Sequence, residues 1–261
     1  MCRWLNIPRS SYYYQAVNPV SEDDLEDKIT YIFLESKSRY GARKIKKCLE
    51  KDGIILSRRR IRRIMKRLNL VSVYQKAAFK PHSKGKNEAP IPNRLDRQFD
   101  QERPLEALVT DLTYVRVDRR WAYVCLIIDL FNREIIGLSV GWHKTAELVK
   151  QAIQSIPYAL TRVKLFHSDR GKEFDNQLID EMLEAFGITR SLSQAGCPYD
   201  NAVMERFYNT LKHEFYYLYK FDSNDILDQK LYEFVYGKYN HVRPHRANGG
   251  LTPYAARCRA A

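Results

Sequence analysis

The chain has 261 residues, and its 44 Lys and Arg against 31 Asp and Glu give a formal net charge of +13. This length suggests two domains, at least one with a sizeable core, and the hydrophobic fraction of 44% is typical of globular proteins. The longest apolar run, residues 122–128, is too short to cross a membrane, and no apolar segment of signal-peptide length follows Met1. The cysteines are scattered without a CxxC pair, which excludes a disulfide framework and favours a cytoplasmic protein.

The positive charge lies in the first third of the chain. Residues 1–94 hold 22 basic and 9 acidic residues, whereas residues 95–261 hold 22 of each. Within the first part, residues 36–67 hold 14 basic and 2 acidic residues. A basic module followed by a neutral one indicates a nucleic-acid anchor attached to another domain, and a solvated basic face is the alternative.

The basic module has the signals of three helices. After a lead-in over residues 1–20, helices are expected from Ser21, over 42–52 and after Ser57, with both serines as N-caps. We interpret residues 21–71 as a small all-α helix-turn-helix domain, in which the third helix suits the major groove of DNA.

The third helix is amphipathic. Its apolar residues share one face, and the expected DNA contacts lie on the other: Arg58, Arg59, Arg62, Arg63 and Lys66. A helix with a merely solvated basic face is the alternative. Prolines and lysines then break any periodicity over residues 72–98, which we interpret as a basic linker.

The second module alternates strands and helices. Three strands joined by short polar connections are expected to form antiparallel hairpins: 108–117, 121–130 and 134–140. The elements expected after them are a helix near 145–159, a strand at 164–167, a helix capped by Asp175, a strand at 188–192 and a helix from about 201 to 217. The fold class is therefore α/β, a five-stranded mixed sheet with flanking helices over residues 99–220, followed by a helical tail over 221–261.

Three acidic residues stand out by their context. Asp111 lies mid-strand among apolar neighbours, Asp169 follows a strand, and Glu205 lies on the polar side of the last core helix. Divalent cations prefer oxygen ligands, and two such ions can flank a phosphate, so the three carboxylates together indicate a metal site. Singly, each is as often a strand-edge, turn or surface residue. Asp129 is a rival acid for which turn capping is expected.

Several strings of the sequence carry a resemblance to a known family. They are Thr110–Val115, Ile128–Arg133, His167–Gly171, Tyr199–Ala202 with Glu205, Tyr239-Asn240 and Arg243–His245. In addition, 35 residues separate Asp169 from Glu205. In order and spacing the chain resembles second-frame (OrfB-type) insertion-sequence transposases of the retroviral-integrase superfamily, and Tyr40 to Leu70 resembles their helix-turn-helix.

The resemblance implies a ribonuclease-H-like core with Asp111, Asp169 and Glu205 as catalytic metal ligands. It implies Mg²⁺, with Mn²⁺ able to substitute and two ions per site. The reaction would be nicking at the element's ends, followed by attack of the freed 3′-hydroxyl on another phosphodiester. Lys212 matches a basic position expected to contact phosphate, and His167 and Asn201 could touch DNA or orient an acid.

The resemblance also implies partners: double-stranded DNA as element ends and target, an upstream first-frame protein as fusion or partner, and further copies of this chain assembled on DNA. A bacterial, nucleoid-associated location without membrane contact is expected. Two departures from the superfamily are Leu108, where a tryptophan is common, and the lack of a His/Cys zinc module. The alternatives are a DNA-binding regulator with an inactive core and a ribonuclease acting on RNA–DNA hybrids.

Overall fold

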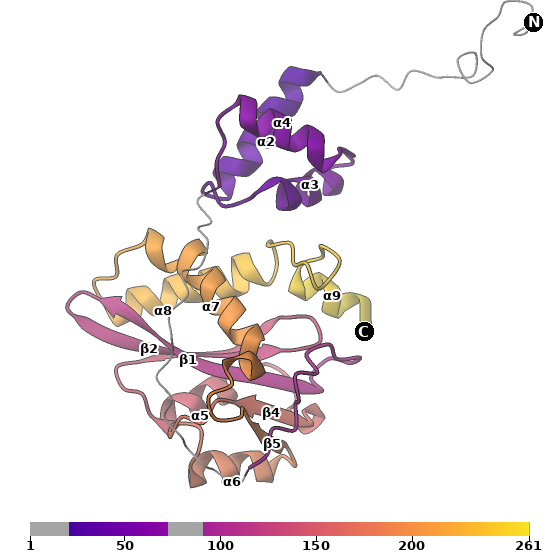
Figure 1. Ribbon diagram of the computed structural model, residues 1–261. Helices are drawn as coiled ribbons and strands as arrows, with labels where there is room; N and C mark the ends of the chain where they lie inside the picture. Colours follow the sequence, from indigo (N-terminus) through magenta and orange to yellow (C-terminus); the bar gives the residue numbers. More distant parts are fainter. Residues whose placement is uncertain (1–20, 73–90, 261) are drawn as a thin grey trace, which may run out of the picture. The chain divides into compact units, whose positions relative to one another are not determined.

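The structure is a computed structural model that describes residues 21–72 and 91–260 (Figure 1). The chain divides into two compact units, Met1–Val73 and Tyr74–Ala261, which are described separately below. The expected lead-in over residues 1–20 and residues 73–90 of the expected linker lie outside the described residues. No helix in the described ranges is long and apolar enough to span a membrane.

The first unit consists of three helices that begin where the sequence predicts. They are α2 (Glu22–Glu35), α3 (Ala42–Lys51) and α4 (Arg58–Arg67). The hydroxyl of Ser21 accepts a hydrogen bond from the backbone N–H of Asp24 (3.0 Å), and that of Ser57 accepts one from the N–H of Arg60 (3.2 Å). Each cap satisfies a backbone donor that the first turn of a helix leaves unpaired, so both predicted N-caps are confirmed.

One apolar cluster joins the three helices. It includes Leu25, Ile29, Phe33, Ile45, Leu49, Ile61, Ile64 and Met65. Fully burying a side chain of this kind contributes about 1.5–3 kcal/mol. Because α4 directs its three apolar residues into this cluster, its basic side chains lie on the outer face.

The second unit is built on a five-stranded sheet of order β3-β2-β1-β4-β5. The strands are β1 (Ala107–Val117), β2 (Arg120–Asp129), β3 (Ile135–Gly141), β4 (Leu165–Ser168) and β5 (Thr189–Leu192). The first three pair antiparallel, whereas β4 pairs parallel with β1 and β5 parallel with β4. The predicted mixed sheet is confirmed.

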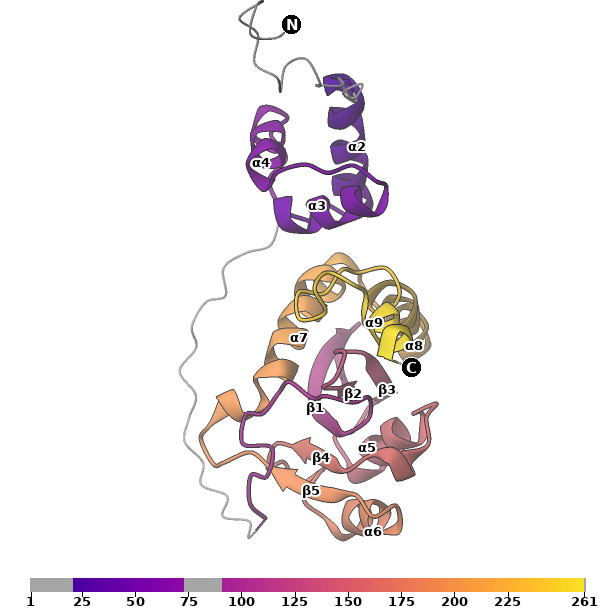
Figure 2. The ribbon, with the colours of Figure 1, turned by 90° about the vertical axis from the view of Figure 1, so that its right-hand side faces the viewer.

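Helices cover both faces of the sheet (Figures 1 and 2). They are α5 (Ala146–Gln154), α6 (Gln177–Ala185), α7 (Ala202–Glu214), α8 (Asn224–Tyr232) and α9 (Pro253–Ala260), with the short η1 (Leu160–Arg162), η2 (Pro198–Asn201) and η3 (Tyr216–Leu218) and a π-helical segment, η4 (Glu233–Tyr239). On β2, Val124 and Leu126 join the core with α7 and α8, whereas Cys125 and Ile127 join the core with α5 and α6. This alternation explains why β2 is apolar throughout.

The predicted cap of α6 is wrong by one residue. The side chain of Asn176, not of Asp175, accepts a hydrogen bond from the N–H of Ile179 (3.1 Å). Asp175 instead forms an ion pair with Arg190 (3.0 Å) on β5. Both residue types cap helices well, and the distant arginine decides between them.

The end of the expected linker belongs to the second unit. Residues 91–98 are described, and Leu95 is buried in the core. The hydroxyl of Ser191 on β5 accepts hydrogen bonds from the N–H groups of Arg94 (2.9 Å) and Leu95 (3.1 Å). The boundary expected at residue 99 is therefore too late.

The tail over residues 221–260 packs onto the sheet rather than forming a separate part. Its residues Phe221, Leu227, Leu231 and Val235 belong to the same core as α7. The side-chain amide of Asn240 accepts from the N–H of Ile135 (3.0 Å) and donates to its carbonyl (2.8 Å), along the outer edge of β3. This pairing satisfies backbone groups at an edge that would otherwise lack a strand partner.

A buried ionic network joins α9 to the β2–β3 turn. Arg257 is paired with Asp129 (2.8 Å) and with Glu134, and all three residues are buried. Asp129 also accepts a hydrogen bond from the N–H of Phe131 (3.1 Å), which confirms the turn-capping role expected for it. The network explains why a carboxylate can lie at 0% exposure in this turn.

We expect Arg257→Met to lower the free energy of unfolding by about 3–5 kcal/mol at pH 7, because it leaves two buried carboxylates without their cation. Urea unfolding followed by circular dichroism measures the change. Arg259→Met, on the exposed side of the same helix, is the matched control and should change stability by less than about 0.5 kcal/mol. Equal stability of the two variants would contradict the structural role of the network.

Candidate active site and DNA-binding helix

The register between β1 and β4 places the first two acids side by side. The parallel ladder pairs Ala107 with Leu165 and Val109 with His167. The same register, continued by two residues, sets Asp111 level with Asp169, which follows the last residue of β4. Neighbouring strands lie about 4.8 Å apart, so the two carboxylates emerge close together.

The electrostatics of the two aspartates agree with this proximity. Burial, and then the charge of Asp169, raise the pKa of Asp111 to about 8. The pKa of Asp169 is also raised, first by burial and then by the charge of Glu173, although the N–H of Gly171 donates to its carboxylate (2.9 Å). Crowded, partly desolvated carboxylates of this kind are relieved by a cation.

Two hydrogen bonds tie α7 and the turn before it to the strand that carries Asp111. The amide of Asn201, at the end of η2, donates to the carbonyl of Thr110 (3.0 Å), and the hydroxyl of Tyr208 donates to the carbonyl of Asp111 (2.5 Å). Burial raises the pKa of Tyr208 well above its usual value, which keeps this hydroxyl a donor. Glu205 lies four residues after Asn201 and three before Tyr208, so it shares their side of the helix.

Glu205 itself is exposed, as the polar face predicted for this helix requires, while Phe207 and Leu211 are buried. In the described ranges, no three His, Cys, Asp or Glu side chains converge closely enough to hold a metal ion. The structure thus brings Asp111 and Asp169 together and carries Glu205 on a helix anchored to the same strand.

The DNA contact suggested for His167 does not fit the structure. The ring is completely buried, and its nitrogens lie 2.8 Å from the hydroxyl of Ser191 and 3.1 Å from that of Ser193. Burial lowers the pKa of His167 to about 4, so the ring is neutral at physiological pH. These contacts join β4 to β5 and to Ser193, which follows β5. The ring therefore lies in the interior of the unit rather than on its surface.

The two other predicted contacts differ in accessibility. Lys212 is exposed on α7, seven residues after Glu205. Asn201 is buried, and its side-chain oxygen has no hydrogen-bond partner within the described part of the chain. An unsatisfied buried acceptor beside the acidic strand is unusual and marks the position as more than a packing residue.

Two ion pairs that the sequence analysis did not predict involve buried glutamates of the same unit. Glu173, buried four residues after Asp169, is paired with Lys144 (2.7 Å) from the loop between β3 and α5. At the other end of α7, Glu214 receives two hydrogen bonds from Arg243 (2.8 and 2.9 Å), and both residues are buried. Neither partner is close in sequence, so no local pattern reveals these pairs.

The helix α4 divides its basic side chains into two groups. Arg60 and Arg67 form ion pairs with the acidic residues Glu22 and Glu26 of α2. Over the described residues, no side-chain ion pair or hydrogen bond involves the five arginine and lysine side chains predicted to contact DNA: Arg58, Arg59, Arg62, Arg63 and Lys66. The surface is hollowed at the start of this helix, beside three of these arginines. The exposed, unpaired face is the one expected to meet phosphates.

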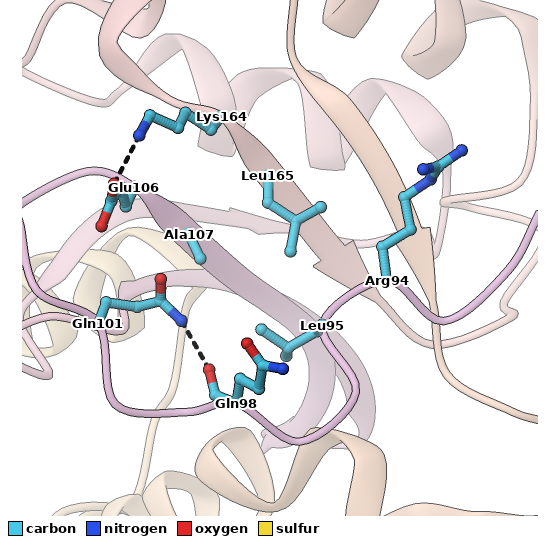
Figure 3. A pocket seen from close by; sticks show the side chains of 8 residues that line it. All are labelled: Arg94, Leu95, Gln98, Gln101, Glu106, Ala107, Lys164 and Leu165. Atoms are coloured by element: carbon cyan, nitrogen blue, oxygen red, sulfur yellow. Dashed lines mark hydrogen bonds and ion pairs between the residues drawn. The ribbon is translucent and has the colours of Figure 1, made fainter.

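A pocket on the second unit lies away from the acids. Figure 3 shows that Arg94, Leu95, Gln98, Gln101, Glu106, Ala107, Lys164 and Leu165 line it. Glu106 and Lys164, which both line it, form an ion pair (2.5 Å). Since Ala107 and Leu165 begin β1 and β4, the pocket is at the end of these strands opposite to Asp169.

Comparison with known proteins agrees with the division of the chain into a helical first unit and a second unit built on a mixed sheet. The model of an HTH-like domain matches residues 21–78, and models of an integrase core domain match residues 101–198 and 186–253. The chain is 31% identical to a 31 kDa protein of insertion element IS600 from Shigella sonnei, over 98% of this chain and 97% of that protein. It is also 31% identical to the candidate transposase InsK of insertion sequence IS150 from Escherichia coli K12, over 97% and 90%. The chain belongs to the insertion-sequence transposases with an integrase core.

A solved structure shows the same fold. The transposase is similar to a chain of the simian T-cell lymphotropic virus intasome complex with a regulatory subunit of PP2A, with a TM-score of 0.51 and 14% identity over 81% of this chain and 70% of that one. The ribonuclease-H-like fold class is therefore confirmed. The sequence strings on which the family resemblance rests have two kinds of role in this transposase. One group surrounds Asp111 and Asp169. The other group, which includes Asn240 and Arg243, holds the C-terminal tail in place.

The buried His167 of the transposase predicts a pH dependence of stability. Its folded pKa of about 4 lies below the ordinary value of 6.5, so its contribution is present above pH 6.5 and is lost as the pH falls toward 4. We expect His167→Gln to flatten the stability profile over this interval by about 2 kcal/mol, measured by denaturant unfolding at several pH values. His143→Gln, at an exposed position, should leave the profile unchanged. A His167→Gln profile parallel to that of the wild type would contradict the assignment.

Proposed function

We propose that this transposase nicks DNA at the ends of its element and joins the freed 3′-hydroxyl to a phosphodiester of target DNA. The observation that carries the proposal is the placement of Asp111 level with Asp169 beneath a helix that presents Glu205. Membership of the insertion-sequence transposases supports the reaction class.

The residues of the site fit divalent cations. Asp111 and Asp169 offer carboxylate oxygens and have raised pKa values, and Asn201, whose side-chain oxygen is unsatisfied within the described part of the chain, contacts the strand that carries Asp111. Asp111, Asp169 and Glu205 would hold Mg²⁺, or Mn²⁺ in its place, as two ions. Bound metal would stabilise the negative charge on the phosphate and activate the attacking oxygen.

The two reactions balance without an external energy source. In the first, a water oxygen bonds to phosphorus and the P–O3′ bond breaks, which leaves a 3′-hydroxyl at the element's end. In the second, this oxygen bonds to phosphorus of the target and expels the target's 3′ oxygen, so one phosphodiester replaces another.

Other residues of the chain would hold the DNA in place. We propose that Lys212 contacts a phosphate beside the site and that the basic face of α4 binds duplex DNA. Strand transfer requires two ends held together, so we also propose assembly of several copies on DNA, with an upstream first-frame protein as fusion or partner.

The triad is tested with Asp111→Asn, Asp169→Asn and Glu205→Gln. Each should lower Mg²⁺-dependent nicking and joining of oligonucleotides that carry the element's ends by at least about 100-fold, because the transition-state charge loses its metal. Asp222→Asn and Glu184→Gln, at exposed positions of the same unit, are controls and should retain activity.

Two outcomes would count against the proposal. Wild-type activity in all three variants would show that the triad assignment is wrong. DNA binding by the wild-type chain, with its upstream partner present, but without cleavage in Mg²⁺ or Mn²⁺, would favour the regulator.

The basic face of α4 is tested separately. We expect Arg62→Ala and Arg63→Ala to weaken DNA binding and to reduce the slope of log K against log salt concentration by about 1 each. Fluorescence anisotropy at several salt concentrations measures both effects. Arg67→Ala removes a charge that is engaged with Glu26 and should change the slope less. Equal slopes for all three variants would place the DNA on another face.

A further inference from the structure

The carboxylate of Glu173 occupies a space that a glycine provides. A Cβ atom at position 171 would lie 2.2 Å from Oε1 and 2.7 Å from Oε2 of Glu173, closer than any real contact. The turn is held by the N–H of Gly171, which donates to Asp169 (2.9 Å). The same turn therefore carries two carboxylates, those of Asp169 and of buried Glu173.

Lys144 supplies a positive charge next to the carboxylate of Glu173. Its ammonium group lies 2.7 Å from Oε1 of Glu173, and its side chain is 46% exposed. Burial alone would lower the pKa of Lys144, but Glu173, and then Asp169 and Asp111, raise it above the ordinary value. In return, the charge of Lys144 lowers the pKa of both aspartates against the larger effect of burial. One ammonium group thus forms an ion pair with Glu173 and acts electrostatically on both aspartates.

We propose that the ammonium group of Lys144 offsets the negative charge of Asp111, Asp169 and Glu173 when no metal is bound. A divalent cation that binds there is then repelled by Lys144 and binds less tightly. The inference rests on the proposed function, because it takes the aspartates as metal ligands. It adds a residue that sets the affinity of the site for metal, through repulsion between the ammonium group and the incoming ion.

An ordinary surface ion pair would not behave in this way. Such a pair is screened by solvent and contributes little. Lys144 differs because its partner Glu173 is buried and because Lys144 also interacts electrostatically with the two aspartates. Lys150, which pairs with exposed Glu147 on α5, offers the matched comparison.

The experiment measures binding of Mn²⁺ alone to the full chain by electron paramagnetic resonance at pH 9, above the pKa of about 8 of Asp111, with Lys144→Met, Lys144→Arg and Lys150→Met. We expect Lys144→Met to bind Mn²⁺ about tenfold more tightly at this pH, because a like charge is removed from the site. Lys144→Arg and Lys150→Met should bind as the wild type does. Thermal unfolding without metal should show that Lys144→Met has a lower melting temperature, with a larger increase on adding Mn²⁺.

Gly171→Ala tests the pairing of Lys144 with Glu173 independently, because it displaces the carboxylate of Glu173 without removing its charge. We expect this variant to change Mn²⁺ affinity, and Lys144→Met to have a smaller effect in its background than in the wild type.

Several results would overturn the inference. Lys144→Met could bind Mn²⁺ as the wild type does, or more weakly. It could also lose DNA affinity while Mn²⁺ binding stays unchanged, which would make Lys144 a DNA contact. Asp111→Asn separates this inference from the proposed function: if that variant binds Mn²⁺ like the wild type, the proposed metal site fails. If Asp111→Asn abolishes binding and Lys144→Met has no effect, only the role of Lys144 fails.

Discussion

The crowding of partly buried carboxylates that the sheet brings together is the constraint on which the second unit depends. Asp111 and Asp169 are level on neighbouring strands because β1 and β4 run parallel in a fixed register. Glu173 joins them from the turn after β4, and burial makes their mutual repulsion stronger than in water. A fold can keep such a cluster only if the surrounding structure is rigid and if a proton or a cation relieves the repulsion.

The rigidity comes from contacts that are distant in sequence. The N-terminal end of α7 is tied to β1 through Asn201 and Tyr208, and its C-terminal end is held by the pair of Glu214 with Arg243. The tail is in turn fixed to the sheet, through Asn240 on the edge of β3 and through Arg257 at the β2–β3 turn. Because α7 carries Glu205, these contacts control where the third acid can lie.

Residues 95–261 hold equal numbers of basic and acidic residues, so their net charge does not reveal how these residues are distributed. Acids are gathered at one site, while several of the bases are occupied in buried pairs elsewhere, as Arg243 and Arg257 are. The first unit shows the opposite distribution. There, Arg60 and Arg67 pair with α2, and the remaining basic side chains of α4 stay on an exposed face, where phosphate can meet them.

The sequence by itself determined what depends on neighbouring residues. The N-caps at Ser21 and Ser57, the division of α4 into apolar and basic faces, the two-sided burial of β2 and the order of strands and helices follow from periodicity and turn chemistry, which act over a few residues. Only the tertiary structure decided the rest. It buried His167 between two serines, paired Asp175 with Arg190 and so left the cap to Asn176, and set Lys144 against Glu173. Each of these outcomes depends on a partner from another element, and the register of the folded sheet is what brings such partners together.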